Sequence, residues 1–319
     1  MKYVITGAAG FVGFHLAKQL LSMGNEVVGL DNLNDYYSVK LKQDRVTELM
    51  AFKGFSFYKL DIVDRLSIDF ITQLSPDVLI HLAAQAGVRY SITNPQAYAD
   101  SNLQGFLNIL EACRKSKPKH FLYASSSSVY GSNSKVPFAE DDIADKPDSF
   151  YAATKRSNEL MAYSYAHLYG IPSTGLRFFT VYGPWGRPDM AVYKFALAMK
   201  NGQTLPVFGD GTMRRDFTYV SDTIKAVIAL SNCAPIGDNP HQIVNVGNQH
   251  PESVLDLIKA LEHKLGLQAK LDFLPIPPGD VPVTFADTTR LQDLTKIVMN
   301  TPLDLGLNSF VEWFNVYHK

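Results

Sequence analysis

An apolar run near the start of the chain, Val4-Ile5-Thr6, leads directly into three spaced glycines, Gly7, Gly10 and Gly13. The first glycine permits a tight turn, the second lets the backbone approach a pyrophosphate, and the third lets a helix pack closely on the strand. A second apolar run ends at Asp31, where a carboxylate can bind both hydroxyls of an adenosine ribose and would repel a 2'-phosphate. This order predicts a strand, turn and helix that hold NAD rather than NADP. The alternative for Asp31 is a capping residue in a solvated loop.

Short β-branched runs alternate with longer helical patterns through the first half of the chain, which is typical of a parallel sheet covered on both faces. Strands are expected near residues 2–6, 25–30, 55–59, 77–82, 119–124 and 172–177. Helices are expected near residues 11–23, 38–51, 95–116 and 150–169. The pattern predicts an α/β fold with a doubly wound parallel (Rossmann) sheet, whose ligands bind at the carboxyl ends of the strands.

After Thr180 the sequence changes to proline- and glycine-rich loops and shorter elements. Helices are expected near residues 190–201, 221–232, 253–265 and 304–317. Ser221 and Ser253 are expected to be N-caps, and Gly266 a C-terminal stop. We therefore expect an NAD-binding Rossmann domain over residues 1–180 and a smaller C-terminal α/β substrate lobe over residues 181–319, with some later segments returning to the first domain.

The composition is that of an ordinary globular protein, with 46% hydrophobic and 19% charged residues. The net charge of -1 gives no sign of nucleic-acid binding, and no uninterrupted apolar run reaches the roughly 18 residues that span a bilayer. Cys113 and Cys233 are isolated, without C-x-x-C spacing, so we expect neither disulfides nor a metal site. A reducing cytoplasm is the default location, without a nucleic-acid or membrane partner.

Tyr151 and Lys155 lie four residues apart, so a helix would place both side chains on one face. A phenol has a pKa of roughly 10, and both a neighbouring ammonium and a cationic nicotinamide would favour its phenolate. A hydroxyl from the serine run at residues 125–128 could share the proton transfer. Tyr-x-x-x-Lys also recurs by chance on surface helices, but together with the glycine turn it indicates a catalytic pair.

These two motifs together resemble the extended short-chain dehydrogenases/reductases that act on nucleotide sugars, and the resemblance runs from Met1 to about residue 290. It implies that Tyr151 takes a proton from a sugar hydroxyl while hydride passes from the same carbon to NAD, which gives a transient 4-keto sugar. Lys155 then lowers the pKa of Tyr151. Ser126, four residues before Tyr130, takes the place of the catalytic hydroxyl.

The cofactor residues follow from the glycine turn, the strand ends and this resemblance. They are Gly7, Gly10, Phe11, Val12, Gly13, Asp31, Asn32, Asp61, Ile62, Leu82, Ala83, Ala84, Gln85, Asn102, Tyr151 and Lys155. Asn102 either hydrogen-bonds the backbone behind the nicotinamide pocket or caps a helix. The run Leu82 to Gln85 either lies along the cofactor or is simply close-packed. His81 is expected to be a packed histidine at a strand end, not a ligand or a base.

The serine run also bears on the reaction. In this family, dehydratases and decarboxylases carry an acidic residue at a position that matches Ser127 or Ser128, and here both are hydroxyls. This favours epimerisation, in which the 4-keto sugar turns over and takes hydride back on its other face. Residues 84–91 and 178–191 resemble UDP-glucuronate 4-epimerases, so the expected reaction is UDP-glucuronate to UDP-galacturonate.

The sugar carboxylate would then be held by Ser127, Ser128, Thr180, Arg187 and Arg89. The alternative for Arg187 is a surface ion pair with Asp189. Further along the chain, the resemblance and local pattern assign the uracil to Val207 and Phe208, the diphosphate to Arg215 and the uridine ribose to Asp280. Arg215 could instead pair with Asp216. Pro277 stands where related enzymes often have a second phosphate-binding arginine, so either Arg290 or another base substitutes or the phosphate is held by fewer charges.

Two other functions stay open from the sequence. A UDP-hexose or UDP-N-acetylhexosamine 4-epimerase would share the cofactor and acid-base residues, and a non-catalytic NAD-binding regulatory protein would share the fold. The resemblance also implies a homodimer built from helices 95–116 and 150–169. The apolar positions Phe106, Ile109, Leu110, Leu160 and Met161 fit such an interface, but they fit packing on the sheet equally well.

Overall fold

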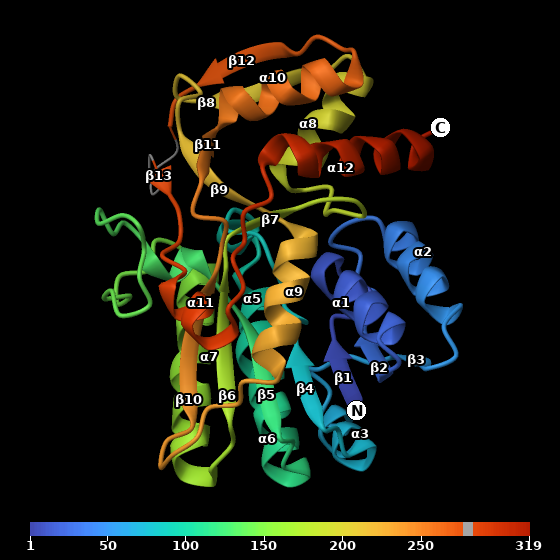
Figure 1. The fold of residues 1–319 in the computed structure, drawn as a ribbon, viewed down its shortest axis with the longest axis vertical. Coiled ribbons are helices and arrows are strands. Elements are labelled where there is room, and N and C mark those ends of the chain that lie inside the picture. Colours follow the sequence, from blue (N-terminus) through green and yellow to red (C-terminus); the bar gives the residue numbers. More distant parts are fainter. Residues whose placement is uncertain (277–282) are drawn as a thin grey trace.

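The computed structural model describes residues 1–276 and 283–319. Within them, a sheet of seven parallel strands forms the centre of the molecule, in the order β10-β6-β5-β4-β1-β2-β3 (Figure 1). Six of these strands lie where the sequence predicts them: β1 (Lys2–Thr6), β2 (Glu26–Asp31), β3 (Phe55–Lys59), β4 (Val78–His81), β5 (His120–Ser126) and β6 (Ser173–Phe178). The strand order reverses after β1, as in a doubly wound sheet, so the predicted fold class is confirmed.

The seventh strand, β10 (His241–Val246), comes from the second half of the chain and pairs with β6 at the sheet edge. Its first three residues are only partly buried, and half of its residues, His241, Gln242 and Asn245, are polar. The sequence analysis did not single it out, because this pattern differs from the continuous apolar runs of the central strands.

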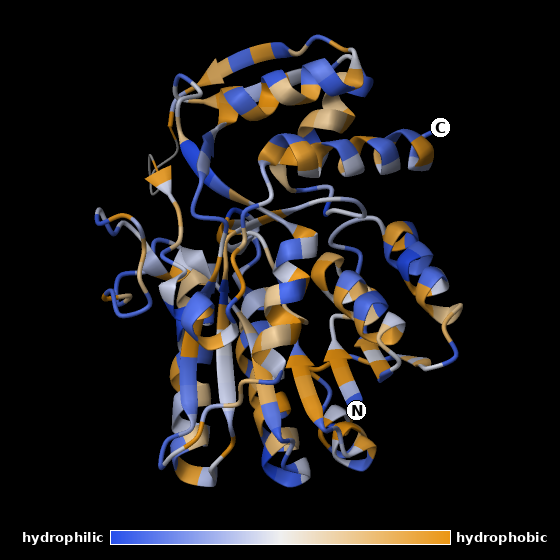
Figure 2. Ribbon diagram, in the orientation of Figure 1, coloured by the Kyte–Doolittle hydropathy of each residue, from blue (hydrophilic) through white to orange (hydrophobic). Residues whose placement is uncertain are grey.

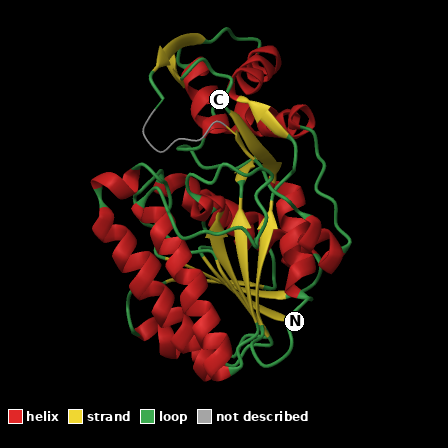
Figure 3. Ribbon diagram, turned by 90° about the vertical axis from the view of Figure 1, so that its left-hand side faces the viewer, coloured by secondary structure: helices red, strands yellow, loops and turns green. Residues whose placement is uncertain are grey.

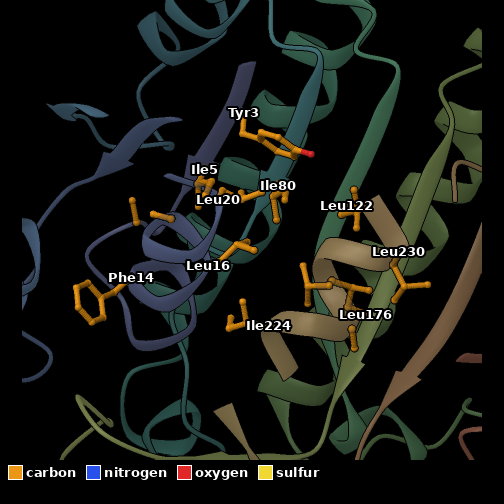
Figure 4. Close-up of a cluster of buried hydrophobic side chains, with 14 of the residues drawn as sticks. Tyr3, Ile5, Phe14, Leu16, Leu20, Ile80, Leu122, Leu176, Ile224 and Leu230 are labelled. Carbon is orange, nitrogen blue, oxygen red and sulfur yellow. The ribbon is translucent and has the colours of Figure 1, made fainter. Parts of the chain in front are cut away.

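Helices cover both faces of the sheet, which Figure 3 shows edge-on between two helical layers. One face carries α1 (Phe11–Ser22) and α9 (Val220–Ser231), and Figure 4 shows Leu16 and Leu20 of α1 with Ile224 and Leu230 of α9 beside the strand residues Ile5, Ile80, Leu122 and Leu176. The other face carries α3 (Leu66–Leu74), α6 (Phe106–Ser116) and α7 (Phe150–Tyr169). Successive residues of a strand point to opposite faces, so both helical layers need apolar strand residues, and parts of β1 and β4 are coloured hydrophobic in Figure 2.

Three of the five positions considered for a dimer interface belong to the core. Phe106, Ile109 and Leu110 are at most 1% exposed and pack in the cluster between α6 and the sheet. Leu160 of α7 is 56% exposed, and Met161 is partly buried against the same cluster. Of the two roles considered for Phe106, Ile109 and Leu110, the structure shows packing on the sheet, because their face of α6 is the one that covers the strands.

A smaller lobe stands over the carboxyl ends of the strands (Figure 1). Its helices α8 (Ala191–Lys200), α10 (Val254–Leu265) and α12 (Leu303–Tyr317) enclose a separate apolar core. Strands β8 (Thr204–Phe208) and β12 (Lys270–Leu274) form a parallel pair. A second small sheet joins β7 (Thr180–Tyr182), β9 (Arg214–Tyr219), β11 (Pro251–Ser253) and β13 (Val283–Thr284). The residues after 180 are thus divided between this lobe and the sheet, which β10 and α9 rejoin.

The helix ends follow local chemistry. The Ser253 hydroxyl accepts a hydrogen bond from the Asp256 amide, and Gly266 ends α10 at φ 66°, as predicted. Helix α9 instead begins after Tyr219, so Ser221 lies inside it and the prediction of an N-cap there was wrong. The helices not yet named are α2 (Val39–Met50), α4 (Tyr90–Thr93), α5 (Pro95–Tyr98) and α11 (Thr289–Thr295).

The helix predicted over residues 95–116 has three parts. A π-helical segment, Ala99–Gly105, connects α5 to α6. Such segments are rare and often occur at functional sites, and this one carries Asn102. Among the described residues, no helix combines the length and hydrophobicity needed to cross a bilayer.

Candidate active site

A cavity of about 840 Å³ lies where the carboxyl ends of the strands face the lobe. This is the place where parallel α/β sheets bind their ligands. Most residues that the sequence assigned to the cofactor line it: Gly7, Gly10, Phe11, Val12, Gly13, Asp31, Asn32, Asp61, Ile62, Leu82, Ala83, Ala84, Gln85, Tyr151 and Lys155. The cavity also contains Ser126, Ser127, Ser128, Thr180, Arg187 and Arg89. One space therefore joins the cofactor, acid-base and sugar residues.

The glycine turn has no room for side chains. Gly7 has φ +74°, and a Cβ there would lie 2.6 Å from the Ala83 nitrogen. A Cβ on Gly13 would lie 2.1 Å from the Gly7 carbonyl oxygen, so α1 can begin this close to β1 only with glycine. The N-terminus of α1 then faces the cavity with amide N–H groups that suit a pyrophosphate.

Asp31 ends β2 at the cavity wall. Its carboxylate accepts hydrogen bonds from the backbone amides of Ala9 (3.1 Å) and Leu33 (2.8 Å). Burial raises the pKa of Asp31, while these bonds and the charge of Lys42 lower it. The carboxylate is thus fixed between the glycine turn and the next loop, where a ribose can reach it. Nearby, the Asn32 amide donates to Asp61 (3.0 Å).

Asn102 lies behind the cavity instead of lining it. Its side-chain oxygen accepts from the Gln85 amide (2.9 Å), and its Nδ2 donates to the Gln85 carbonyl (3.0 Å) and to Thr154 Oγ1 (3.0 Å). Of the two roles considered from the sequence, the structure contains the backbone bond. The helix cap in this region is Asn94, which accepts from the Ala97 amide. The π-helical turn thus holds the strand-end loop that forms one wall of the cavity.

Tyr151 and Lys155 occupy the same face of α7, near its N-terminus. Ser149 caps this helix by accepting from the Ala152 amide (3.1 Å), which fixes where its first turn begins. Lys155 is 3% exposed and donates to the Ala124 carbonyl at the end of β5 (2.8 Å). Tyr151 and Ser126 are hydrogen-bonded.

The electrostatics of the acid-base group follow from its burial. Burial raises the pKa of Tyr151, whereas the Ser126 hydrogen bond and the positive charge of Arg187 lower it. Burial also lowers the pKa of Lys155 to about 8. Tyr151 is therefore a neutral phenol in this state, and a further positive charge beside it would be needed to make it a base.

His81 is excluded as the base by its surroundings. Its Nδ1 lies 2.7 Å from Thr6 Oγ1, and the ring is 2% exposed. Burial, together with the charge of Lys155, lowers the pKa of His81 to about 3. It is a neutral, packed side chain at the end of β4, in agreement with the sequence expectation.

Arg187 lies in the wall of the cavity and forms the ion pair with Asp189 that the sequence offered as its alternative role. It lines the cavity near enough to Tyr151 for its charge to act on that phenol, and it also pairs with Asp189 through Nε (3.1 Å to Oδ1) and Nη2. Ser126 Oγ donates to Ser128 Oγ (3.1 Å) within a 3-10 turn, Ser127–Tyr130, that begins at the end of β5. A guanidinium and a hydroxyl cluster thus face the same space.

The residues assigned to the uracil and the diphosphate, Val207, Phe208 and Arg215, lie in the lobe. Val207 is fully buried in the lobe core, so its side chain faces that core, and its assignment to the uracil stays a prediction. Phe208 packs against Arg89, whose guanidinium carbon is 4.3 Å from the ring centre. Arg215 Nη1 donates to the Arg214 carbonyl (3.0 Å). None of Val207, Phe208 or Arg215 lines the cavity formed by the described residues.

Two further assignments concern the diphosphate and the uridine ribose. Arg290, considered as a substitute phosphate ligand, is bound to both carboxylate oxygens of Asp141 (2.8 and 2.9 Å). Asp280 and Pro277 lie outside the described residues.

Sequence reasoning missed the segment between β2 and α2 together with the first turn of α2. Asn34, Tyr36, Tyr37 and Lys42 all line the cavity. Lys42 and, one turn later, Arg45 are at most 4% exposed. Charged residues on an amphipathic helix are expected to face solvent, so only the unusual Asn- and Tyr-rich loop before the helix could have pointed to this wall.

Comparison with known proteins gives a consistent result. The model of the NAD dependent epimerase/dehydratase family matches residues 3–247. A probable UDP-glucuronate 4-epimerase of Rhizobium meliloti is 46% identical, over 100% of this chain and 98% of that protein. UDP-glucuronate 4-epimerase 2 of Arabidopsis thaliana is 43% identical over 99% of this chain and 76% of its own length. The crystal structure of UDP-glucuronic acid 4-epimerase from Bacillus cereus, in complex with UDP-glucuronic acid and NAD, is 35% identical over 99% of this chain and 100% of that one, with a TM-score of 0.92.

Proposed function

The chain belongs to the NAD dependent epimerase/dehydratase family, and from this premise we propose how its cavity interconverts UDP-glucuronate and UDP-galacturonate through a transient 4-keto sugar. The enzyme is an NAD-dependent nucleotide-sugar 4-epimerase. Residues 1–180 supply the cofactor site, residues 181–319 supply much of the nucleotide-sugar site, and the reaction takes place between them.

The residues present fit NAD. The glycine turn leaves a cradle that any Cβ would fill, and Asp31 is placed for a ribose. The chemistry that NAD supplies when bound is removal of hydride from C4 of the sugar and its return to the other face, with no net redox change. The wall formed by Leu82 to Gln85, held from behind by Asn102, orients the reactive end.

Tyr151 removes the C4 hydroxyl proton and later returns it. Burial raises its pKa and keeps it protonated in this structure, and a further positive charge beside the phenol, such as a bound nicotinamide would supply, would favour the phenolate. Ser126 hydrogen-bonds the same phenol and can bridge it to the sugar oxygen. Lys155, held by the Ala124 carbonyl, adds positive charge on the same helix face.

The site is suited to epimerisation because hydroxyls stand where elimination would need an acid. Ser127 and Ser128 line the cavity next to Ser126, and neither can act as a carboxylic acid or its conjugate base. The 4-keto sugar therefore meets no carboxyl group at these two positions, which favours return of hydride to C4 over elimination.

The proposed preference for a uronate rests on one observation, that the Arg187 guanidinium lies in the same cavity as Tyr151. A carboxylate on C6 matches its fork of donors, and Thr180, Ser127 and Ser128 add hydroxyls. A neutral hexose would leave this charge without a partner in the sugar. The cation and the hydroxyls beside it thus support a UDP-uronate over a UDP-hexose.

NMR spectroscopy of the product from labelled UDP-glucuronate, with UDP-glucose in parallel, tests this function. We expect UDP-galacturonate to form and UDP-glucose to react far more slowly. Arg187→Ala should weaken UDP-glucuronate binding roughly 10- to 100-fold with little effect on UDP-glucose. The control is Arg114→Ala, which removes a guanidinium paired with Glu111 outside the cavity. Equal turnover of both sugars by the unmodified enzyme would overturn the assignment.

We also propose that the enzyme is a homodimer in the cytoplasm. The outward side of α6 and α7 carries Leu107, Leu160 and Leu168, at 36%, 56% and 63% exposure, which supports an interface there. Cys113 and Cys233 are free thiols, as expected of a protein in a reducing compartment. Sedimentation of the unmodified protein and of Leu160→Glu should give a dimer and a weakened dimer.

A further inference from the structure

We propose that Tyr36 is a positioning residue that fixes Arg187 through Asp189 and so sets the enzyme's preference for a uronate over a neutral sugar. This inference rests on the proposed function, because it takes Arg187 to be the carboxylate ligand. The resemblance from which the substrate residues were assigned does not include Tyr36 or Asp189 among them.

The geometry is a chain of three side chains. Tyr36 Oη donates to Asp189 Oδ2 at 3.2 Å. Asp189 in turn accepts from Arg187, at Oδ1 from Nε (3.1 Å) and at Oδ2 from Nη2. The carboxylate thus holds one edge of the guanidinium, and the phenol holds the carboxylate.

This arrangement leaves the other edge of Arg187 for a ligand. A guanidinium has five N–H donors, and Asp189 engages only the edge formed by Nε and Nη2. Within residues 1–276 and 283–319, no hydrogen bond to protein uses Nη1. A carboxylate from the sugar can therefore bind at Nη1 and Nη2 while Asp189 stays in place. Asp189 orients the cation and does not compete for it.

Tyr36 reaches Asp189 because its loop is held locally. The Asn34 amide donates to Asn32 Oδ1 (3.0 Å), and Asn34 Oδ1 accepts from Lys42 Nζ (2.6 Å). The ring of Tyr36 packs on that of Tyr90, with centroids 5.0 Å apart. Burial and the neighbouring Asp189 raise the pKa of Tyr36 to about 12, so the phenol stays a donor at neutral pH.

Gly87 provides the space that this contact needs. It has φ +100°, and a Cβ on it would lie 2.4 Å from the Tyr36 hydroxyl. A glycine is thus required on two grounds, its backbone conformation and the position of the phenol. The loop after β4 and the loop after β2 are fitted to each other around the oxygen that contacts Asp189.

The backbone near Arg187 is fixed by a different residue. Arg45 is fully buried and donates through Nη2 to the carbonyls of Trp185 (2.6 Å) and Gly186 (3.1 Å), and through Nη1 to the Ala9 carbonyl (2.8 Å). This joins the loop of Arg187 to the glycine turn without using Tyr36. Loss of the Tyr36 hydroxyl should therefore release the Arg187–Asp189 pair while the loop backbone keeps its place.

The experiment is isothermal titration of the NAD-bound enzyme with UDP-glucuronate, UDP-glucose and UDP. Tyr36→Phe removes one oxygen, and we expect the Kd for UDP-glucuronate to rise about 10-fold while those for UDP-glucose and UDP change less than about twofold. The matched control is Tyr165→Phe, since Tyr165 also donates to a carboxylate, that of Glu111 (2.7 Å), away from the cavity. It should alter none of the three affinities.

A double-mutant cycle separates the inference from the proposed function. If Arg187→Ala weakens the binding of UDP-glucuronate and of UDP-glucose equally, Arg187 is not the carboxylate ligand. If Arg187→Ala weakens the binding of UDP-glucuronate alone, adding Tyr36→Phe to that variant should cause no further loss of affinity, because the effect of Tyr36 passes through Arg187. An additive loss, or a Tyr36→Phe enzyme with unchanged preference, would overturn the positioning role and leave the proposed function standing.

Discussion

Replacing Glu159 by glutamine removes the anion at the centre of a buried ion-pair network on α7, two turns from Tyr151. Glu159 is 1% exposed and binds the 2% exposed Arg177 through two parallel hydrogen bonds, 2.8 and 2.9 Å long. It also accepts from Ser125 Oγ (2.6 Å) and Arg156 Nη1 (2.8 Å). Although burial opposes ionisation, Arg177 holds the pKa of Glu159 below its usual value.

The expected loss is large because Arg177 would stay buried without its counter-charge. Removing one partner of such a pair costs about 3–5 kcal/mol of unfolding free energy. With an unfolding entropy of about 2.1 cal/mol/K per residue, 319 residues give about 0.7 kcal/mol/K, so Tm should fall by about 4–7 °C. Urea unfolding followed by circular dichroism, with thermal scans, measures both quantities.

The control for Glu159→Gln is an ion pair of the same charge types on the surface. Asp69 and Lys115 are 68% and 44% exposed, so Asp69→Asn should cost less than about 1 kcal/mol. The double variant Glu159→Gln/Arg177→Met should be more stable than Glu159→Gln alone, because it removes the unpaired cation. A loss as small as that of Asp69→Asn would refute the argument.

Three further outcomes follow from the structure. Burial lowers the pKa of His81 to about 3 and that of His120 to about 4, so below pH 6.5 the unfolded chain binds more protons than the folded one. Between pH 7 and pH 5 each of the two histidines should therefore lower the free energy of unfolding by about 2 kcal/mol, which urea unfolding at the two pH values measures. Asp31→Ala should raise the Kd of NAD at least about 10-fold and narrow its advantage over NADP, measured by titration of each cofactor. Gly87→Ala should lose about 1–3 kcal/mol in urea unfolding, whereas Gly170→Ala, with nothing within 4 Å of its Cβ, should lose less.

The cofactor half of the site could be predicted from the sequence because its residues follow one another locally. A turn such as Gly7 to Gly13 and a strand end such as Asp31 need only the order of strand, turn and helix to be placed. Strand β10 escaped notice because an edge strand with polar residues lacks the apolar run of a central one. The π-helical segment around Asn102 has no sequence rule of its own.

The nucleotide half could not be placed in the same way. Along β8 buried residues alternate with more exposed ones, so whether Val207 or Phe208 faces a ligand depends on which face of the strand the lobe core covers. The lobe core covers the face that carries Val207, and a strand register shifted by one residue would have placed Phe208 there instead. The Tyr36–Asp189 contact joins residues 153 positions apart, and no local pattern encodes it.

One face of α7 connects the chemistry to the stability of the fold. Tyr151, Lys155 and Glu159 follow at intervals of four, and they bond in turn to Ser126, Ala124 and Ser125 at the end of β5. The buried ion pair of Glu159 therefore fixes the register between this helix and that strand, two turns from the phenol. A helix that slips when the pair is broken must move Tyr151 away from its serine, so Glu159→Gln should also lower kcat at temperatures where the protein is still fully folded.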